Sequence, residues 1–265
     1  MPDDNSGELP RICWCPTGPL AFLPIHAAGL YDTAEAGSKV FDFVISSYTP
    51  TVSALLQPTS FNRNHPKILA VAQGQQSIDN FSALPSTRAE IRLVGKRAVE
   101  NSVEFIVAED DEGTVEYVLE EMKKCHWVHL ACHGTQDLDN PTKSAFILAD
   151  GNLELAEIIK HPLPHAEFAF LSACQTATGD PKLAEEAVHL AAGMMLAGYR
   201  SVIATMWSIL DKDGPEVADA VYAEMLKDGK ADHTRAAYAL HHAVQKLRLS
   251  GAPFIAWMPF IHMGA

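Results

Sequence analysis

The chain has 265 residues, 48% of them hydrophobic, which is enough for one large or two small globular domains with a substantial core. Its 20 Lys and Arg against 33 Asp and Glu give a formal net charge of −13, which argues against nucleic-acid and membrane partners. Five cysteines are too sparse a set for a disulfide framework, so we expect a reducing, cytoplasmic setting. We expect neither a secretory signal nor a membrane span, because no long apolar run is present.

The first 60 or so residues differ in character from the rest of the chain. The stretch RICWCPTGPLAFLPIHAAG (11–29) is rich in Pro and Gly turn signals and predicts a β-hairpin. Residues 41–56 predict a strand followed by a short helix. We expect this region, about residues 1–60, to pack onto a core formed by residues 66–265, so that residues 1–265 make a single domain.

Short apolar runs alternate with longer amphipathic segments from residue 66 onward. The runs predict buried strands at 67–73, 103–109, 127–133, 167–174 and 201–207, a weaker strand or hairpin arm at 144–150, and a last strand at 258–264. Helical patterns lie between them, at 86–101, 113–124, 153–160, 183–198, 215–229 and 232–251. This alternation is typical of an α/β domain with a mainly parallel sheet.

Three polar residues carry helix-start signals. Thr87 and Glu90 have the spacing of a capping box at the start of the first helix. Asp232 precedes the last helix and predicts its N-cap.

Two reactive side chains end predicted strands, at the edge where an open parallel sheet binds its ligands. His133 ends the strand 127–133 and is followed by Gly134, and Cys174 ends the strand 167–174. The intervening residues leave room for the element at 144–150 and a crossover helix, so the two strands could be neighbours. Both side chains would then lie at one edge.

A cysteine peptidase needs such a pair. The thiolate is the nucleophile, an imidazole assists proton transfer, and backbone N–H groups hold the developing oxyanion. The amides of Gly134 and Cys174 would suit that last task, since Gly134 has no Cβ to keep a substrate away. On spacing alone, the alternative is a core cysteine and a His-Gly turn.

The stretch CHWVHLACH (125–133) also raises the question of a metal site. On a strand, His129 and His133 would share one face while Cys132 points to the other. Zinc needs converging ligands from a second element, and no second ligand motif is present. We therefore expect no metal and no cofactor, and we interpret His129 and Cys132 as core residues.

Several spaced motifs resemble the CHAT domain, a member of the caspase-like clan related to separase. In order, they are WCPTGPLAFLPIHAAG (14–29), VISSYTPTVSAL (44–55), VHLACHG (128–134), FLSACQTATG (170–179), EEAVHLAAGMMLAGYRSVIATMW (185–207) and APFIAWMPFIHMG (252–264). The resemblance implies a caspase-like three-layer sandwich around a mainly parallel sheet. It also implies a cysteine endopeptidase with Cys174 as nucleophile, His133 as general base and acid, and Gly134 as oxyanion-hole amide.

The resemblance also bears on partners. CHAT domains are often joined to tetratricopeptide repeats, so a regulatory domain in a longer chain and activation by a partner are expected. The substrate would be a protein bound as an extended strand. Two alternatives stay open: a protease-fold signalling or scaffold module that binds without turnover, and a cysteine hydrolase acting on a small molecule.

The loop after the strand 201–207 borders the same edge. In separases, which the chain resembles, an acidic residue of the matching loop receives a basic P1 side chain. Asp211 or Asp213 could be the counterpart here, as substrate-binding residues with Trp207 as a pocket wall. Asp211 is preferred for the pocket, because Asp213 stands where the N-cap of the next helix belongs. Ser172 stands where metacaspases have Asp, so a neutral pocket also stays open.

Overall fold

A computed structural model of the chain describes residues 9–33, 35, 37–56, 66–74, 83–137, 139–172 and 187–265, with residues 187–189 as backbone only. Cys174 and the first residues of the helix predicted at 183–198 lie outside these ranges. The predicted strands and helices within them are present, with ends that differ by a few residues.

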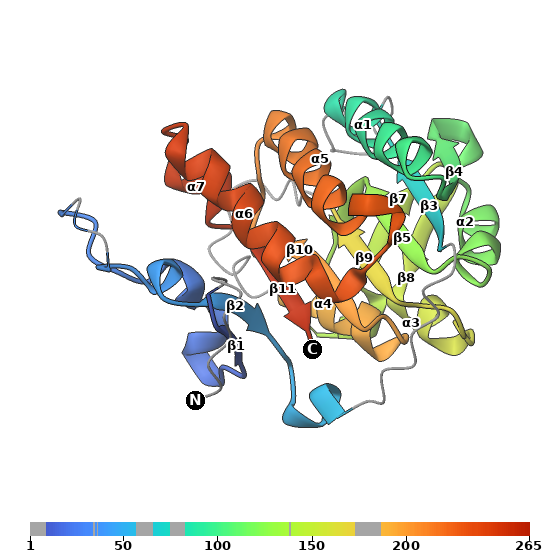
Figure 1. The fold of residues 1–265 in the computed structure, drawn as a ribbon. Coiled ribbons are helices and arrows are strands. Elements are labelled where there is room, and N and C mark those ends of the chain that lie inside the picture. Colours follow the sequence, from blue (N-terminus) through green and yellow to red (C-terminus); the bar gives the residue numbers. More distant parts are fainter. Residues whose placement is uncertain are drawn as a thin grey trace.

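An eight-stranded sheet forms the middle of the structure, in the order β1-β2-β11-β10-β9-β5-β3-β4 (Figure 1). In chain order its strands are β1 (Arg11–Trp14), β2 (Ile45–Tyr48), β3 (Lys67–Ala72), β4 (Glu104–Glu109), β5 (Trp127–Ala131), β9 (Phe168–Leu171), β10 (Ser201–Thr205) and β11 (Phe260–Gly264). Within the described ranges, every neighbouring pair is parallel except β10 with β11. The mainly parallel α/β sheet is confirmed.

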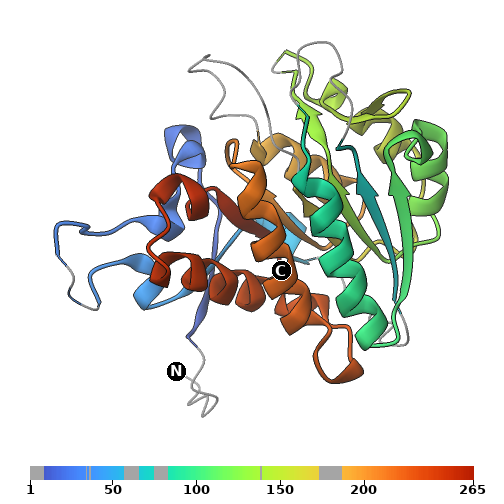
Figure 2. The same cartoon turned by 90° about the horizontal axis from the view of Figure 1, so that it is seen from above.

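Helices cover both faces of this sheet. Figure 2 shows α1 (Ser86–Glu100), α5 (Gly214–Met225) and α6 (Ala236–Leu249) side by side over one face. The other face packs against α2 (Val115–Met122), α3 (Leu155–Lys160) and α4 (Ala187–Leu196). Strand β5 alternates between the two cores: Trp127 packs under α5, while Val128 and Leu130 pack on the opposite side.

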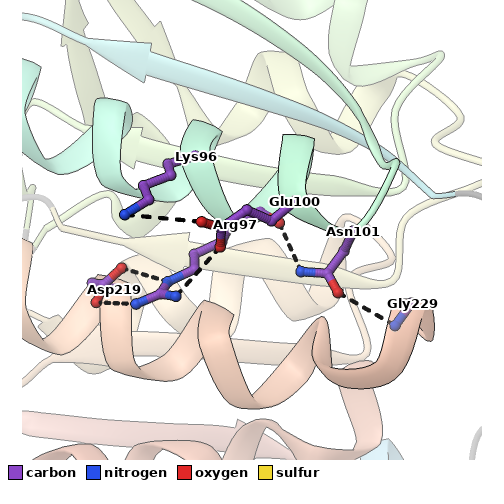
Figure 3. Close-up of polar contacts among 6 residues, drawn as sticks. All are labelled: Lys96, Arg97, Glu100, Asn101, Asp219 and Gly229. Carbon is purple, nitrogen blue, oxygen red and sulfur yellow. Dashed lines mark hydrogen bonds and ion pairs between the residues drawn. The ribbon is translucent and has the colours of Figure 1, made fainter.

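Helices α1 and α5 are joined at their outer surfaces by a two-pronged ion pair (Figure 3). Arg97 donates from Nε and Nη2 to the carboxylate oxygens of Asp219 at 2.7 and 2.8 Å. Asn101 extends this contact by donating to the Arg97 carbonyl and accepting from the Gly229 amide. Such bidentate geometry fixes the relative orientation of two helices better than a single contact does.

The hairpin predicted in the N-terminal region is wrong. β1 pairs with β2 in parallel, with Arg11 opposite Ile45 and Trp14 opposite Tyr48. Parallel strands cannot be joined by a tight turn, and the connection here is long and holds the 3₁₀ turns Gly18–Phe22, Ile25–Ala27 and Val40–Asp42. β2 is followed, as predicted, by a short helix, Val52–Leu56, of 3₁₀ type. β1 and β2 extend the main sheet beyond β11, while the division into one domain stays a prediction.

A second, smaller sheet contains β6 (His133–Thr135), β7 (Ala145–Leu148) and β8 (Gly151–Glu154), all antiparallel. The hairpin-arm alternative for residues 144–150 is therefore the right one. β11 ends the described fold and follows the short helix α7 (Phe254–Trp257).

Candidate functional site

Strands β5 and β9 lie next to each other in the main sheet. They pair in parallel, with Trp127 opposite Phe168 and Leu130 opposite Leu171. The predicted neighbourhood of these two strands is confirmed, and their carboxyl ends lie at one edge of the sheet. Cys174 follows Leu171 by three positions in the sequence but lies outside the described residues.

The strand carrying His133 differs from the prediction. β5 ends at Ala131, the chain bends at Cys132, and His133 begins β6 of the small sheet. There His133 lies opposite Ile147 and Gly134 lies opposite Phe146. The continuous apolar run from 127 to 133 concealed this break, because both halves are buried while their backbones pair with different partners. His133 is 4% exposed and Gly134 is also buried.

The stretch before His133 is structural, as predicted. Cys132 is buried in the core between the sheet and α2–α4. His129 is fully buried, and its ring stacks on Phe170 of β9 at 4.8 Å between centroids and 14° between planes. Within the described ranges, no three His, Cys, Asp or Glu side chains are placed to hold a metal ion.

A buried carboxylate lies where β5 and β9 end. Glu90 of α1 is 2% exposed, and its Oε1 is 2.9 Å from Nε2 of His129. Its Oε2 accepts a hydrogen bond of 3.0 Å from Oγ of Ser172, the residue that follows β9. Because a carboxylate accepts, Nε2 of His129 carries the proton in this pair.

The predicted capping box at the start of α1 is wrong. Glu90 uses both carboxylate oxygens on His129 and Ser172, and Thr87 donates its hydroxyl to the carbonyl of Leu84. A signal was available in the sequence, since Glu90 falls on the same helical stripe as the buried Ile91, Val94 and Ala98. A carboxylate on an apolar stripe indicates a buried partner rather than a cap.

The loop between β10 and α5 contains the three predicted substrate-binding residues. Trp207 is half-buried and packs against the core near the start of the loop. This contact alone does not make Trp207 the wall of a pocket. Asp211 accepts a 2.9 Å hydrogen bond from the backbone N–H of Ser86, the first residue of α1. That carboxylate therefore stabilises the N-terminus of α1.

Asp213 precedes α5 but does not cap it through its side chain, so that prediction is wrong. Its backbone is already helical (φ −87°, ψ −23°), whereas a capping side chain needs an extended backbone to reach back to the helix amides. Among the described residues, Oδ2 of Asp213 is buried without a hydrogen-bond partner. Burial raises the pKa of this carboxyl, although Lys212 opposes the shift. Asp232, in contrast, accepts from the Thr234 amide and so caps the 3₁₀ turn His233–Arg235 that leads into α6, rather than α6 itself.

No helix in the described ranges is both long and apolar enough to cross a membrane. A mainly parallel sheet between two helical layers, in which the strands preceding His133 and Cys174 in the sequence are neighbours, defines a caspase-like fold of the kind found in cysteine peptidases. The family model of the CHAT domain matches residues 2–265, and the chain belongs to this family.

The solved structures that share this fold include two of gingipain R. One is the crystal structure of the Arg-specific cysteine proteinase gingipain R (RGPB), with a TM-score of 0.53 at 12% identity, covering 88% of this chain and 56% of the gingipain chain. The other is the complex of the pro- and mature domains of Porphyromonas gingivalis RgpB, with a TM-score of 0.53 at 12% identity, covering 88% and 57% of the two chains. At this identity the likeness shows the fold alone, and the chain spans little more than half the length of either protein. Comparison with curated proteins gave no match.

Proposed function

We propose that the chain is a cysteine endopeptidase that cleaves protein substrates through Cys174 and His133. The observation that carries the proposal is the parallel pairing of β5 with β9, since these strands lead to the His133 and Cys174 segments at the same edge of the sheet. Membership of the CHAT family and the gingipain-like fold support a peptidase over an unrelated use of the two residues.

The proposed reaction has two steps. The Cys174 thiolate attacks the scissile carbonyl carbon, and the bond to the leaving nitrogen breaks as protonated His133 donates its proton to that nitrogen. Backbone amides of Gly134 and Cys174 hold the negative oxygen of the intermediate. Neutral His133 then takes a proton from water, which attacks the thioester and releases the acid and Cys174.

The proposed substrate binds as an extended strand, and a partner or a further domain of a longer chain activates the enzyme. Extended binding suits a sheet edge, where main-chain hydrogen bonds supply affinity and side-chain pockets supply specificity. His133 and Gly134 lie in β6, which is an outer strand of the small sheet β6-β7-β8.

A basic P1 residue is the proposed preference, with Asp213 as its partner. Asp211 is engaged by the Ser86 amide, whereas one Asp213 oxygen is buried without a described partner. A buried carboxylate oxygen without a hydrogen-bond partner lowers the stability of the fold, and such groups concentrate at functional sites. The fold neighbour gingipain R is described as Arg specific, which supports the same preference.

The test of the nucleophile is peptide-library cleavage by the purified chain, alongside Cys174→Ala and His133→Ala. We expect both variants to lose cleavage by at least ~10³-fold while keeping the thermal unfolding midpoint of the parent. Cleavage by Cys174→Ala at the parental rate would refute the assignment. If the parent chain binds a partner protein but cleaves no peptide, either alone or with that partner present, the scaffold alternative would be favoured.

The test of the pocket compares Asp213→Asn with Asp211→Asn on two peptides that differ only at P1, one with Arg and one with a neutral residue. We expect Asp213→Asn to lower kcat/KM for the Arg peptide about tenfold more than for the neutral one. Asp211→Asn should affect both peptides equally, because it acts on the start of α1. Equal loss for both peptides with Asp213→Asn would remove that residue from the pocket.

A further inference from the structure

Glu90 touches each of the segments that lead to the proposed site. Its first partner, His129, is in β5 and stands four residues before His133. Its second partner, Ser172, directly follows β9 and stands two residues before Cys174. A third segment closes over the same carboxylate, since a Cβ added at Gly214 would lie 2.7 Å from Oε2 of Glu90 and 3.0 Å from Oγ of Ser172.

The position of Gly214 connects the carboxylate to the β10–α5 loop. Gly214 is the first residue of α5 and directly follows Asp213. The same loop is also bonded to α1 three residues before Gly214, where Asp211 accepts from the Ser86 amide. Helix α1 therefore joins β5, the residue after β9 and the β10–α5 loop through contacts made by its first two turns.

Fold stability alone is a poor explanation for this arrangement. Glu90, His129 and Ser172 are 2%, 0% and 6% exposed, so the carboxylate has lost nearly all its contact with water. Replacing a buried polar cluster with apolar side chains of similar volume is commonly neutral or stabilising. What the carboxylate adds is geometry, because two directed hydrogen bonds set the positions of His129 and Ser172 relative to one helix.

The ring of His129 is held on two sides. Its Nε2–H donates to Glu90, and its face stacks on Phe170 of the neighbouring strand. Nδ1 of His129 has no hydrogen-bond partner within the described ranges. The Glu90 contact is therefore the directed interaction that sets the rotation of this ring, while the stack joins β5 to β9.

We propose that Glu90 is a positioning residue for the Cys174–His133 pair, a role that rests on the proposed peptidase function. It sets the spacing between β5 and the residue that follows β9, acting through His129 on one side and Ser172 on the other. A displacement of about 1 Å between reacting groups can cost about 10²-fold in rate. Loss of Glu90 therefore lowers kcat and leaves KM nearly unchanged, since the substrate does not touch it.

The experiment compares carboxylates at two positions. Glu90→Leu removes both hydrogen bonds, and Asp219→Leu removes the ion pair that holds the outer surface of the same helix (Figure 3). We expect Glu90→Leu to lower kcat at least ~10-fold with KM within about twofold, and Asp219→Leu to leave both within about twofold. Glu90→Gln should restore most of kcat, because its oxygen accepts from His129 while its NH₂ donates to the Ser172 hydroxyl.

A second variant covers the case in which Glu90→Leu does not fold. Ser172→Ala removes one of the two bonds with little change in volume and should lower kcat in the same direction. Added to Glu90→Leu, it should cause no further loss, because both act through one contact. The proposal is overturned if Glu90→Leu, or Ser172→Ala in its place, keeps the parental kcat, if the loss is confined to KM, or if Asp219→Leu loses as much.

A turnover-independent readout separates this proposal from the peptidase function. Iodoacetamide alkylation at Cys174, followed by mass spectrometry of the peptide that contains it, reports thiol reactivity, with Cys174→Ala as the blank. We expect Glu90→Leu to slow it several-fold and Asp219→Leu to leave it unchanged. Normal alkylation in Glu90→Leu would refute the positioning role even if no peptide is cleaved. Absence of cleavage by the parent, with slowed alkylation in Glu90→Leu, would refute only the peptidase function.

Discussion

Acid should unfold this protein through one buried and two half-buried histidines where the N-terminal strands meet α6. His26, His241 and His262 line one small cavity there. Burial lowers the pKa of His26 to about 4, assisted by the charge of Arg248 and opposed by a hydrogen bond to the Met258 carbonyl. Burial likewise lowers the pKa of His241 to about 4 and that of His262 well below its usual value.

The sign follows from where the protons bind. A histidine whose pKa is lowered in the folded state takes up its proton at a higher pH in the unfolded state. The free energy of unfolding is therefore highest above about pH 6.5 and falls as the pH drops toward 4. For His26, a pKa that falls from 6.5 to about 4 corresponds to about 3 kcal/mol over the whole range, of which about 2 kcal/mol is lost between pH 7 and pH 5.

Urea unfolding followed by Trp fluorescence at pH 7 and pH 5 measures this loss. His26→Gln can accept from the Tyr48 hydroxyl and donate to Met258 as His26 does, but it cannot take up a proton. It should reduce the loss between the two pH values by about 2 kcal/mol, whatever its effect at pH 7. His242→Gln, at an exposed position, is the control and should change nothing. An undiminished loss in His26→Gln would refute the reasoning.

Three further predictions concern the site and its support. Gly214→Ala should lower the unfolding midpoint and slow Cys174 alkylation, because its Cβ would displace Glu90 and Ser172; a parental alkylation rate would contradict the close packing. Asp213→Asn should stabilise the fold at neutral pH and lose that gain in acid, because burial raises the pKa of this carboxyl, so the charged form is the unfavourable one in the folded state; chemical unfolding at pH 7 and pH 4 checks the sign. Phe146→Ala should destabilise the fold by about 3–5 kcal/mol, as expected for a fully buried aromatic side chain; a loss below about 1 kcal/mol would mean that the small sheet holding Gly134 is loosely packed.

Local pattern was enough for the fold class and for most elements. The apolar runs at 67–73 and 201–207 became strands that are buried on both faces, which period and composition reveal. The run at 103–109 also became a strand, β4, but its predicted burial is wrong, because β4 lies at the edge of the sheet and only Ala108 in it is buried. The helix at 86–101 followed from its buried stripe, and Pro215 and Gly198 stand near the ends of helices as their backbone preferences require. The order of the motifs in the sequence likewise indicates the CHAT family.

Only the tertiary structure decided which strands pair and which groups the polar side chains contact. Nothing local distinguishes a strand that continues from one that bends at Cys132 and joins another sheet, because residues on both sides are buried. The parallel pairing of β1 with β2 depends on a segment about thirty residues away. Asp211 and Asp213 look equivalent in the sequence until Ser86, 125 positions from Asp211, engages one of them. Glu90 resembled a capping residue for the same reason. Its partners are His129 of β5 and Ser172, which follows β9, and hydrogen bonds depend on distance in space rather than along the chain.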